Sequence, residues 1–167
     1  MEDIKLELIR NSFYPPDGKV KFLFVGESPP YGGKFFYNAN TGLYKYTKEA
    51  FSRAINIEWR DDAEFLYYFR DHGFFLDDLC HEPVNQYKRG EGRNRQLKRQ
   101  KSLPDFTTRM KKYNPENIII VMKAIEKFVK KAIEKNNLSI VTYLLPFPSY
   151  GHQQQYVDKL VKILKNR

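Results

Sequence analysis

Three short segments of this chain combine polar side chains with proline or glycine, and each begins where an apolar run ends. They are Gly26–Gly42, Asp77–Asn85 and Pro146–His152. The first contains Glu27, the only carboxylate in that segment, and Ser28, whose hydroxyl can orient water but is a poor base unless another group activates it. In the last, a serine precedes a helical pattern, whose N-terminal amides favour an anion such as phosphate.

The apolar runs predict the strands of a parallel sheet. Four of them are short and bounded by polar or turn residues: Val20–Val25, Phe74–Leu79, Asn117–Met122 and Leu138–Leu144. Apolar side chains instead recur at helical spacing within residues 43–54, 65–69, 124–133 and 156–164. Strands that alternate with helices indicate parallel pairing through right-handed crossovers. We therefore expect one α/β domain over residues 1–167, a three-layer α/β/α sandwich around a central four-stranded, mostly parallel sheet. The three polar segments should converge on one cleft at the carboxyl edge of that sheet.

A polar, strongly basic segment follows the second predicted strand. Lys88–Lys101 holds seven basic residues against one acidic residue, Glu91, so it carries +6 of the chain's net charge of +9. We expect a loop over about 86–103 at the rim of the cleft, followed by a short helix that begins near Pro104. The charge favours a polyanion, whose phosphates would meet Lys88, Arg89, Arg93, Arg95, Lys98, Arg99 and Lys101. The alternative is a solvated or disordered loop without a ligand.

Size and composition exclude several classes of protein. The chain has 167 residues, enough for one ordinary domain. A single cysteine, Cys80, leaves no internal disulfide and no self-contained iron–sulfur or multi-cysteine metal site, and we expect no metal or other cofactor. No apolar run approaches the ~20 residues that span a bilayer. Residues 1–20 lack a secretory apolar stretch. We expect a cytoplasmic monomer that does not contact membranes.

The strand-end segments resemble motifs of the uracil-DNA glycosylase superfamily. Gly26-Glu27-Ser28-Pro29-Pro30 is similar to that family's first motif, and Phe147-Pro148-Ser149 resembles the second, usually His-Pro-Ser. Gly33-Lys34-Phe35-Phe36 resembles the segment that carries a base-stacking phenylalanine, and Asp77-Asp78-Leu79 occupies the place of a base-reading asparagine. The resemblance implies an α/β/α domain for DNA repair by base excision. It would bind double- or single-stranded DNA that carries a modified base, and hydrolyse the N-glycosidic bond of a damaged or deaminated base without a metal.

The resemblance also implies roles for individual residues. Glu27 or Ser28 would position water or stabilise the sugar cation. Phe36, with Phe35 as the alternative, would stack on the extruded base, and Asp78 would meet the edge of that base. The remaining contacts to the DNA would come from Pro29, Pro30, Ser149, Tyr150 and Gly151, and Tyr150 or His152 would fill the gap in the duplex.

Three positions depart from the family's pattern. Phe147 replaces the usual histidine and cannot donate a hydrogen bond to a leaving base, although His152 lies five residues further on. Ser28 stands where many relatives have aspartate or asparagine. An ionised Asp78 would only accept hydrogen bonds, which suits a base edge with an amino group better than uracil. Two alternatives therefore stay open: a binding module of the same fold without catalysis, and an enzyme acting on a free nucleotide or another phosphorylated small molecule.

Overall fold

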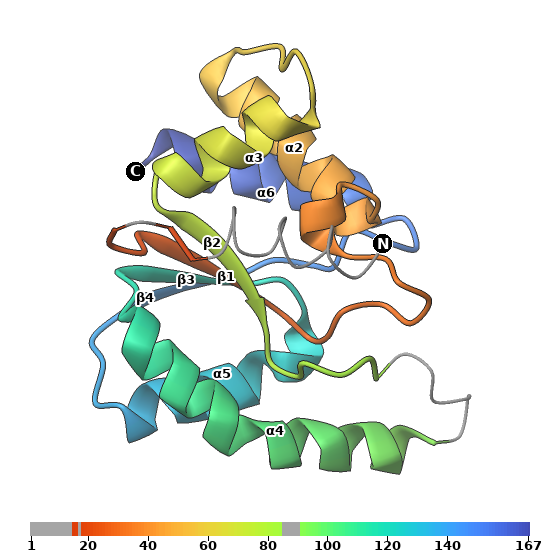
Figure 1. The fold of residues 1–167 in the computed structure, drawn as a ribbon, viewed down its shortest axis with the longest axis vertical. Coiled ribbons are helices and arrows are strands. Elements are labelled where there is room, and N and C mark those ends of the chain that lie inside the picture. Colours follow the sequence, from red (N-terminus) through yellow and green to blue (C-terminus); the bar gives the residue numbers. More distant parts are fainter. Residues whose placement is uncertain (1–14, 17, 85–90) are drawn as a thin grey trace, which may run out of the picture.

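The computed structural model describes residues 15–16, 18–84 and 91–167, and a parallel sheet lies at its centre (Figure 1). The strands are β1 (Phe22–Gly26), β2 (Phe74–Asp78), β3 (Asn117–Ile120) and β4 (Val141–Leu144), in the order β2-β1-β3-β4. All pairings are parallel, and Gly26 lies opposite Asp78 at the carboxyl edge. The predicted four-stranded parallel sheet is confirmed.

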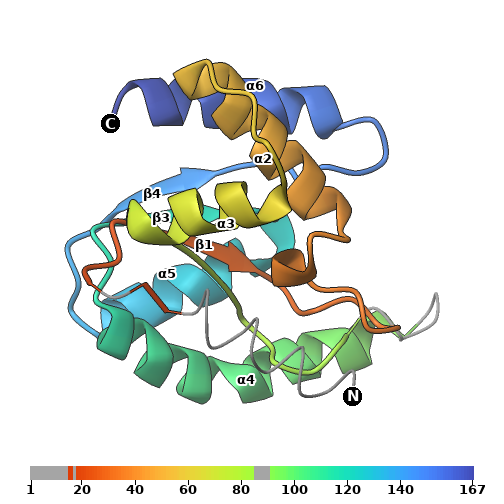
Figure 2. The same cartoon turned by 45° about the horizontal axis from the view of Figure 1, so that its top comes forward.

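Helices cover both faces of this sheet, as Figure 1 and Figure 2 show. On one face lie α2 (Gly42–Ile55), α3 (Asp62–Asp71) and α6 (Gln153–Lys165); on the other lie α4 (Gly92–Tyr113) and α5 (Glu126–Lys135). α2 packs against α6, and α4 packs against α5. Two short 3-10 helices, η1 (Phe36–Asn38) and η2 (Lys123–Ile125), follow β1 and β3. The three-layer α/β/α arrangement is confirmed.

The core is aromatic and holds the strand ends in place. Because β1 is an inner strand with both faces covered, all five of its residues are buried. Phe24 packs against Phe69, and Phe51 packs edge-on against Phe74 with ring centroids 4.8 Å apart. Burial of these rings is the main stabilising contribution here. These contacts fix α2 and α3 against β1 and β2.

The prediction of a basic loop over 86–103 is wrong for residues 92–103, which form the first half of α4. The side of α4 that faces the sheet carries, at helical spacing, Arg95, Arg99, Leu103, Phe106 and Met110. Because the first two residues on this side are Arg95 and Arg99, the apolar pattern typical of a helix is missing before Leu103. Pro104 lies inside α4 rather than at its start. Because proline has no N–H, the carbonyl of Gln100 does not receive its helical hydrogen bond. Pro104 and Gln100 both lie on the exposed side of α4.

The outer side of α4 is basic. Arg93 and Lys101 are exposed, and Lys98 pairs with Glu82. The basic residues at positions 88 and 89 lie outside the described residues. Neither α4 nor any other helix in the described part of the chain combines the length and the apolar character needed to span a bilayer.

Candidate functional site

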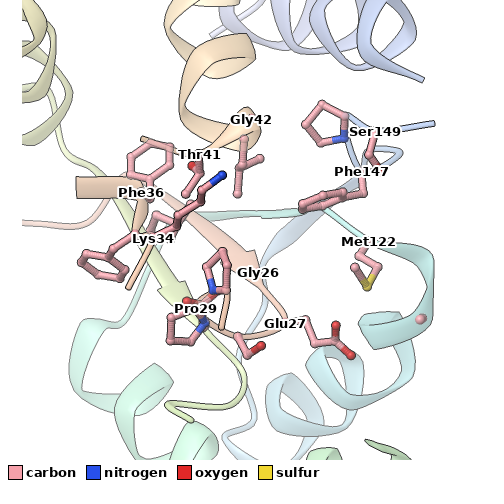
Figure 3. Close-up of a pocket in the computed structure, with 18 of the residues that line it drawn as sticks. Gly26, Glu27, Pro29, Lys34, Phe36, Thr41, Gly42, Met122, Phe147 and Ser149 are labelled. Carbon is pink, nitrogen blue, oxygen red and sulfur yellow. The ribbon is translucent and has the colours of Figure 1, made fainter. Parts of the chain in front are cut away.

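The segments after the strands line one pocket of about 870 Å³ at the carboxyl edge of the sheet (Figure 3). Gly26 ends β1 and residues 27–30 follow it, Asp78 ends β2, and residues 147–150 follow β4. Figure 3 shows Phe36 and Lys34 on one side of the view and Phe147 and Met122 on the other, with Gly26 and Pro29 between them. The predicted first and last polar segments thus meet at one cleft, and of the described residues of the second segment Asp78 alone lines it.

Glu27 is held by two arginines from α4. Arg95 Nε donates to Glu27 Oε1 at 2.8 Å and Arg99 Nε donates to the same oxygen at 2.6 Å. The Nη2 atoms of both arginines also contact the carboxylate, which is only 5% exposed. The hydrogen bond to Glu27 raises the pKa of Arg95, although burial opposes this. Since both carboxylate oxygens are engaged, the geometry favours a positioning role for Glu27 over activation of water.

A second buried ion pair ties α4 to the end of β2. Arg109 binds the buried carboxylate of Asp77, and its Nη2 donates to the carbonyl oxygens of Asp78 at 3.1 Å and Leu79 at 3.3 Å. Burial lowers the pKa of Arg109, but the carboxylates of Asp77 and Asp105 raise it by more. Both ends of the inner face of α4 are therefore fixed to the sheet through arginine.

The backbone of the first motif is tied to the segment after β2. Leu79 N donates to Gly26 O and Cys80 N donates to Glu27 O, each at 2.8 Å. Ser28 Oγ accepts a hydrogen bond from Val84 N at 3.1 Å. The Ser28 hydroxyl, predicted to position water, thus also supports the loop that follows β2.

Asp78 lies in the pocket and is nearly buried. Its backbone N donates to Asp77 Oδ1 at 2.9 Å. A Cβ atom on Gly26 would overlap Asp78 Oδ1, so glycine at this position is what allows the carboxylate to lie against β1. The structure therefore brings Asp78 together with the first motif, as predicted.

The two candidate stacking phenylalanines have different surroundings. Phe36 lines the pocket but is only 3% exposed, packed edge-on against Tyr37 and Tyr44. Phe35 is half-buried in the same wall. Tyr37 anchors this segment to β2, because its hydroxyl accepts from Leu76 N at 2.8 Å and donates to Leu76 O at 3.1 Å; burial raises its pKa well above the usual range. Phe36 thus belongs mainly to the core, whereas Phe35, which also contacts Tyr37, is the more exposed of the two.

The loop after β4 presents an exposed aromatic side chain beside the pocket. Tyr150 is 98% exposed and has a left-handed backbone with φ of 50°. Ser149 N donates to Phe147 O at 2.8 Å, and His152 N donates to Ser149 O at 3.0 Å. Phe147, Ser149 and Tyr150 line the pocket, whereas Gly151 and His152 do not.

The basic residues divide into two groups. Arg95 and Arg99 line the pocket, whereas Arg93, Lys98 and Lys101 lie on α4 outside it. Lys34 also lines the pocket. It was not predicted as a site residue, although it belongs to the segment Gly33-Lys34-Phe35-Phe36. Within the described ranges, no three His, Cys, Asp or Glu side chains are grouped so as to hold a metal ion.

The sequence matches no family model and no curated protein. The resemblance to the glycosylase superfamily therefore depends on the motifs of this chain alone.

The Glu27 ion pairs give a first prediction. In Glu27→Gln, two arginines lose their buried counter-charge, and we expect the free energy of unfolding to fall by about 3 kcal/mol. Urea denaturation followed by circular dichroism measures this. The matched control is Glu82→Gln, which removes an exposed partner of Lys98 and should leave the urea midpoint unchanged. Equal midpoints for the two variants would contradict the anchoring role of Glu27.

Proposed function

We propose that the protein binds DNA over the carboxyl edge of its sheet, takes a damaged or deaminated base into the pocket, and hydrolyses the N-glycosidic bond. One observation carries this proposal: three segments far apart in the sequence, each similar to a glycosylase motif, line the same pocket. A single motif of this kind is common among unrelated proteins. The presence of all of them in one pocket at the same edge of the sheet supports the proposal more strongly.

The walls of the pocket suit a nucleotide unit of DNA. A volume of about 870 Å³ lies within the range of small-molecule sites. Phe35 and Phe147 offer aromatic surface, and the carboxylate of Asp78 offers hydrogen-bond acceptors. A base taken out of the DNA stack needs both kinds of contact. Aromatic side chains take the place of the neighbouring bases on which it stacked, and polar groups recognise the edge of the base by hydrogen bonds.

The chemistry requires charge stabilisation on both sides of the bond. As the bond between C1′ and the base nitrogen breaks, positive charge grows on the sugar and negative charge on the base. Water then adds its hydroxyl to C1′, and its proton ends on the base. Because Glu27 is occupied by the two arginines, Asp78 is the lining carboxylate that we assign to the sugar cation or to an amino group of the base.

Tyr150 is suited to the gap that an extruded base leaves. It is an almost fully exposed ring on a loop at the pocket rim, and protein side chains that enter base steps are apolar or aromatic. The exposed basic residues of α4, Arg93 and Lys101, would add sequence-independent attraction to phosphates.

A second function is favoured by the details of the first motif. The Glu27 carboxylate and the Ser28 hydroxyl both have partners, and Phe147 carries no donor for a leaving base. These observations favour a module that binds a modified base without cleaving it. The two functions differ in whether an abasic site is formed.

A panel of labelled oligonucleotides distinguishes the two functions. Each carries one modified base, in single- and double-stranded form, and alkaline cleavage reports abasic sites. We expect product from at least one base, with a rate about 100-fold lower in Asp78→Ala because a reacting carboxylate is lost. The control Asp158→Ala, on exposed α6 surface, should keep the rate. Salt-sensitive binding with no product from any base would favour the module, and absence of binding would contradict both functions.

Asp78 also determines which base is accepted. If the ionised carboxylate accepts from an amino group, Asp78→Asn should improve excision of uracil relative to bases with an amino group, since the amide can also donate. The measured quantity is the ratio of the two excision rates in the variant and the parent protein. A fall in that ratio would instead indicate that the carboxylate is protonated when it contacts the base.

The role of Tyr150 predicts a dependence on strandedness. Tyr150→Ala should lower the rate or affinity on duplex DNA by about tenfold and leave single-stranded DNA unaffected, because only in a duplex does the extruded base leave a gap opposite its former partner. Tyr67→Ala, which removes another exposed tyrosine on α3, is the control. Equal losses on both kinds of DNA would show that Tyr150 does not act in the stack.

A further inference from the structure

We propose that Arg95, Glu27 and Arg99 form a phosphate-binding site in the wall of the pocket, so that the pocket recognises a nucleotide through its phosphate as well as its base. This inference deepens the proposed function and rests on it for the nucleotide nature of the ligand. It assigns the two pocket-lining arginines a task separate from that of the exposed basic residues on α4.

The charge of the cluster is the first argument. Two guanidinium groups share one carboxylate, so the cluster keeps one positive charge. Lys34 and Asp78 are the other charged side chains among the described residues that line this pocket, and their charges cancel. The wall therefore has a net positive charge where Arg99 is only 12% exposed and Arg95 is 33% exposed. An anion is attracted more strongly in such a partly buried place than on open surface.

The hydrogen-bonding capacity of the cluster is the second argument. Arg95 uses Nε and Nη2 on Glu27, and the structure gives no partner to its Nη1 among the described residues. Arg99 directs Nε and Nη2 to Glu27 and Nη1 to Gln96 Oε1 at 3.3 Å, a long bond that a stronger acceptor could replace. Planar guanidinium groups with spare N–H donors match the oxygens of a phosphate.

Preorganisation is the third argument. Arginine has many rotamers, and ordering it at the moment of binding weakens affinity. Glu27 orders both side chains beforehand, because its buried carboxylate follows directly on β1 and the arginines lie one helical turn apart on α4. The ligand therefore meets donors that are already fixed, in the pocket that Phe147 also lines.

The shared chemistry is a phosphate group, and it has two sources: the monoester of a free nucleotide or a diester of DNA. For the first, calorimetry compares each deoxynucleoside with its 5′-monophosphate. For the second, an oligonucleotide with one modified base is compared with copies in which the phosphate 5′ or 3′ of that base is a neutral methylphosphonate. In at least one of these comparisons we expect the phosphate to strengthen binding about tenfold.

The variants decide whether the arginine cluster is responsible. In Arg99→Gln the phosphate effect should fall below about threefold, and Arg95→Gln, at the more exposed position, provides the same test if Arg99→Gln does not fold. Lys112→Gln removes one exposed positive charge from the last turn of α4, outside the pocket, and should keep the full effect. A phosphate effect that persists in both arginine variants, or no phosphate effect in any comparison, would overturn the proposal.

The outcome is separate from that of the glycosylase proposal. An arginine-dependent phosphate effect without any abasic product would support the phosphate site and count against hydrolysis. Abasic product together with equal binding of the phosphate and methylphosphonate oligonucleotides would support hydrolysis and reject the site. A preference for the free monophosphate over DNA would point to an enzyme of nucleotides.

Discussion

The buried carboxylate of Glu27 determines how the site is assembled. It follows the central strand β1 and binds Arg95 and Arg99, which fixes the start of α4 against the carboxyl edge of the sheet. The pair between Asp77 and Arg109 fixes the same helix to the end of β2. Because a buried charge is strongly destabilised without its partner, these contacts allow little freedom in the position of α4. The wall of the pocket depends on that position.

This constraint changes the chemical interpretation of the first motif. A carboxylate in a strand-end turn could activate water, but this one has both oxygens on guanidinium groups. The motif thus positions Arg95 and Arg99, which leave the cluster with a net positive charge. Asp78, on the neighbouring strand, carries the carboxylate that we assign to the reaction. Gly26 makes this division possible, since a side chain there would displace Asp78. The exposed aromatic ring of Tyr150 lies at the rim of the same pocket.

Local pattern was enough to predict the strands, the layers and the convergence of the polar segments, because buried parallel strands such as Asn117–Ile120 are continuous apolar runs. It was not enough for the start of α4, where arginines occupy the inward positions. Glu27 lies 68 residues from Arg95, and no local signal connects them, although Arg95 and Arg99 continue the stripe of Leu103. Phe36 is more buried than Phe35 because it packs against Tyr44. Two adjacent phenylalanines in a sequence do not indicate which of them makes such a contact.

The most direct test of this account is amide NMR during titration with an oligonucleotide that carries one modified base. The account predicts that shifts concentrate at the carboxyl edge: residues 26–30, Asp78, residues 147–151 and the first turns of α4. Amides at the opposite edge, near Gly73 and Asn117, should not move. Shifts concentrated at that opposite edge, or along the exposed side of α6, would contradict a nucleotide site in this pocket.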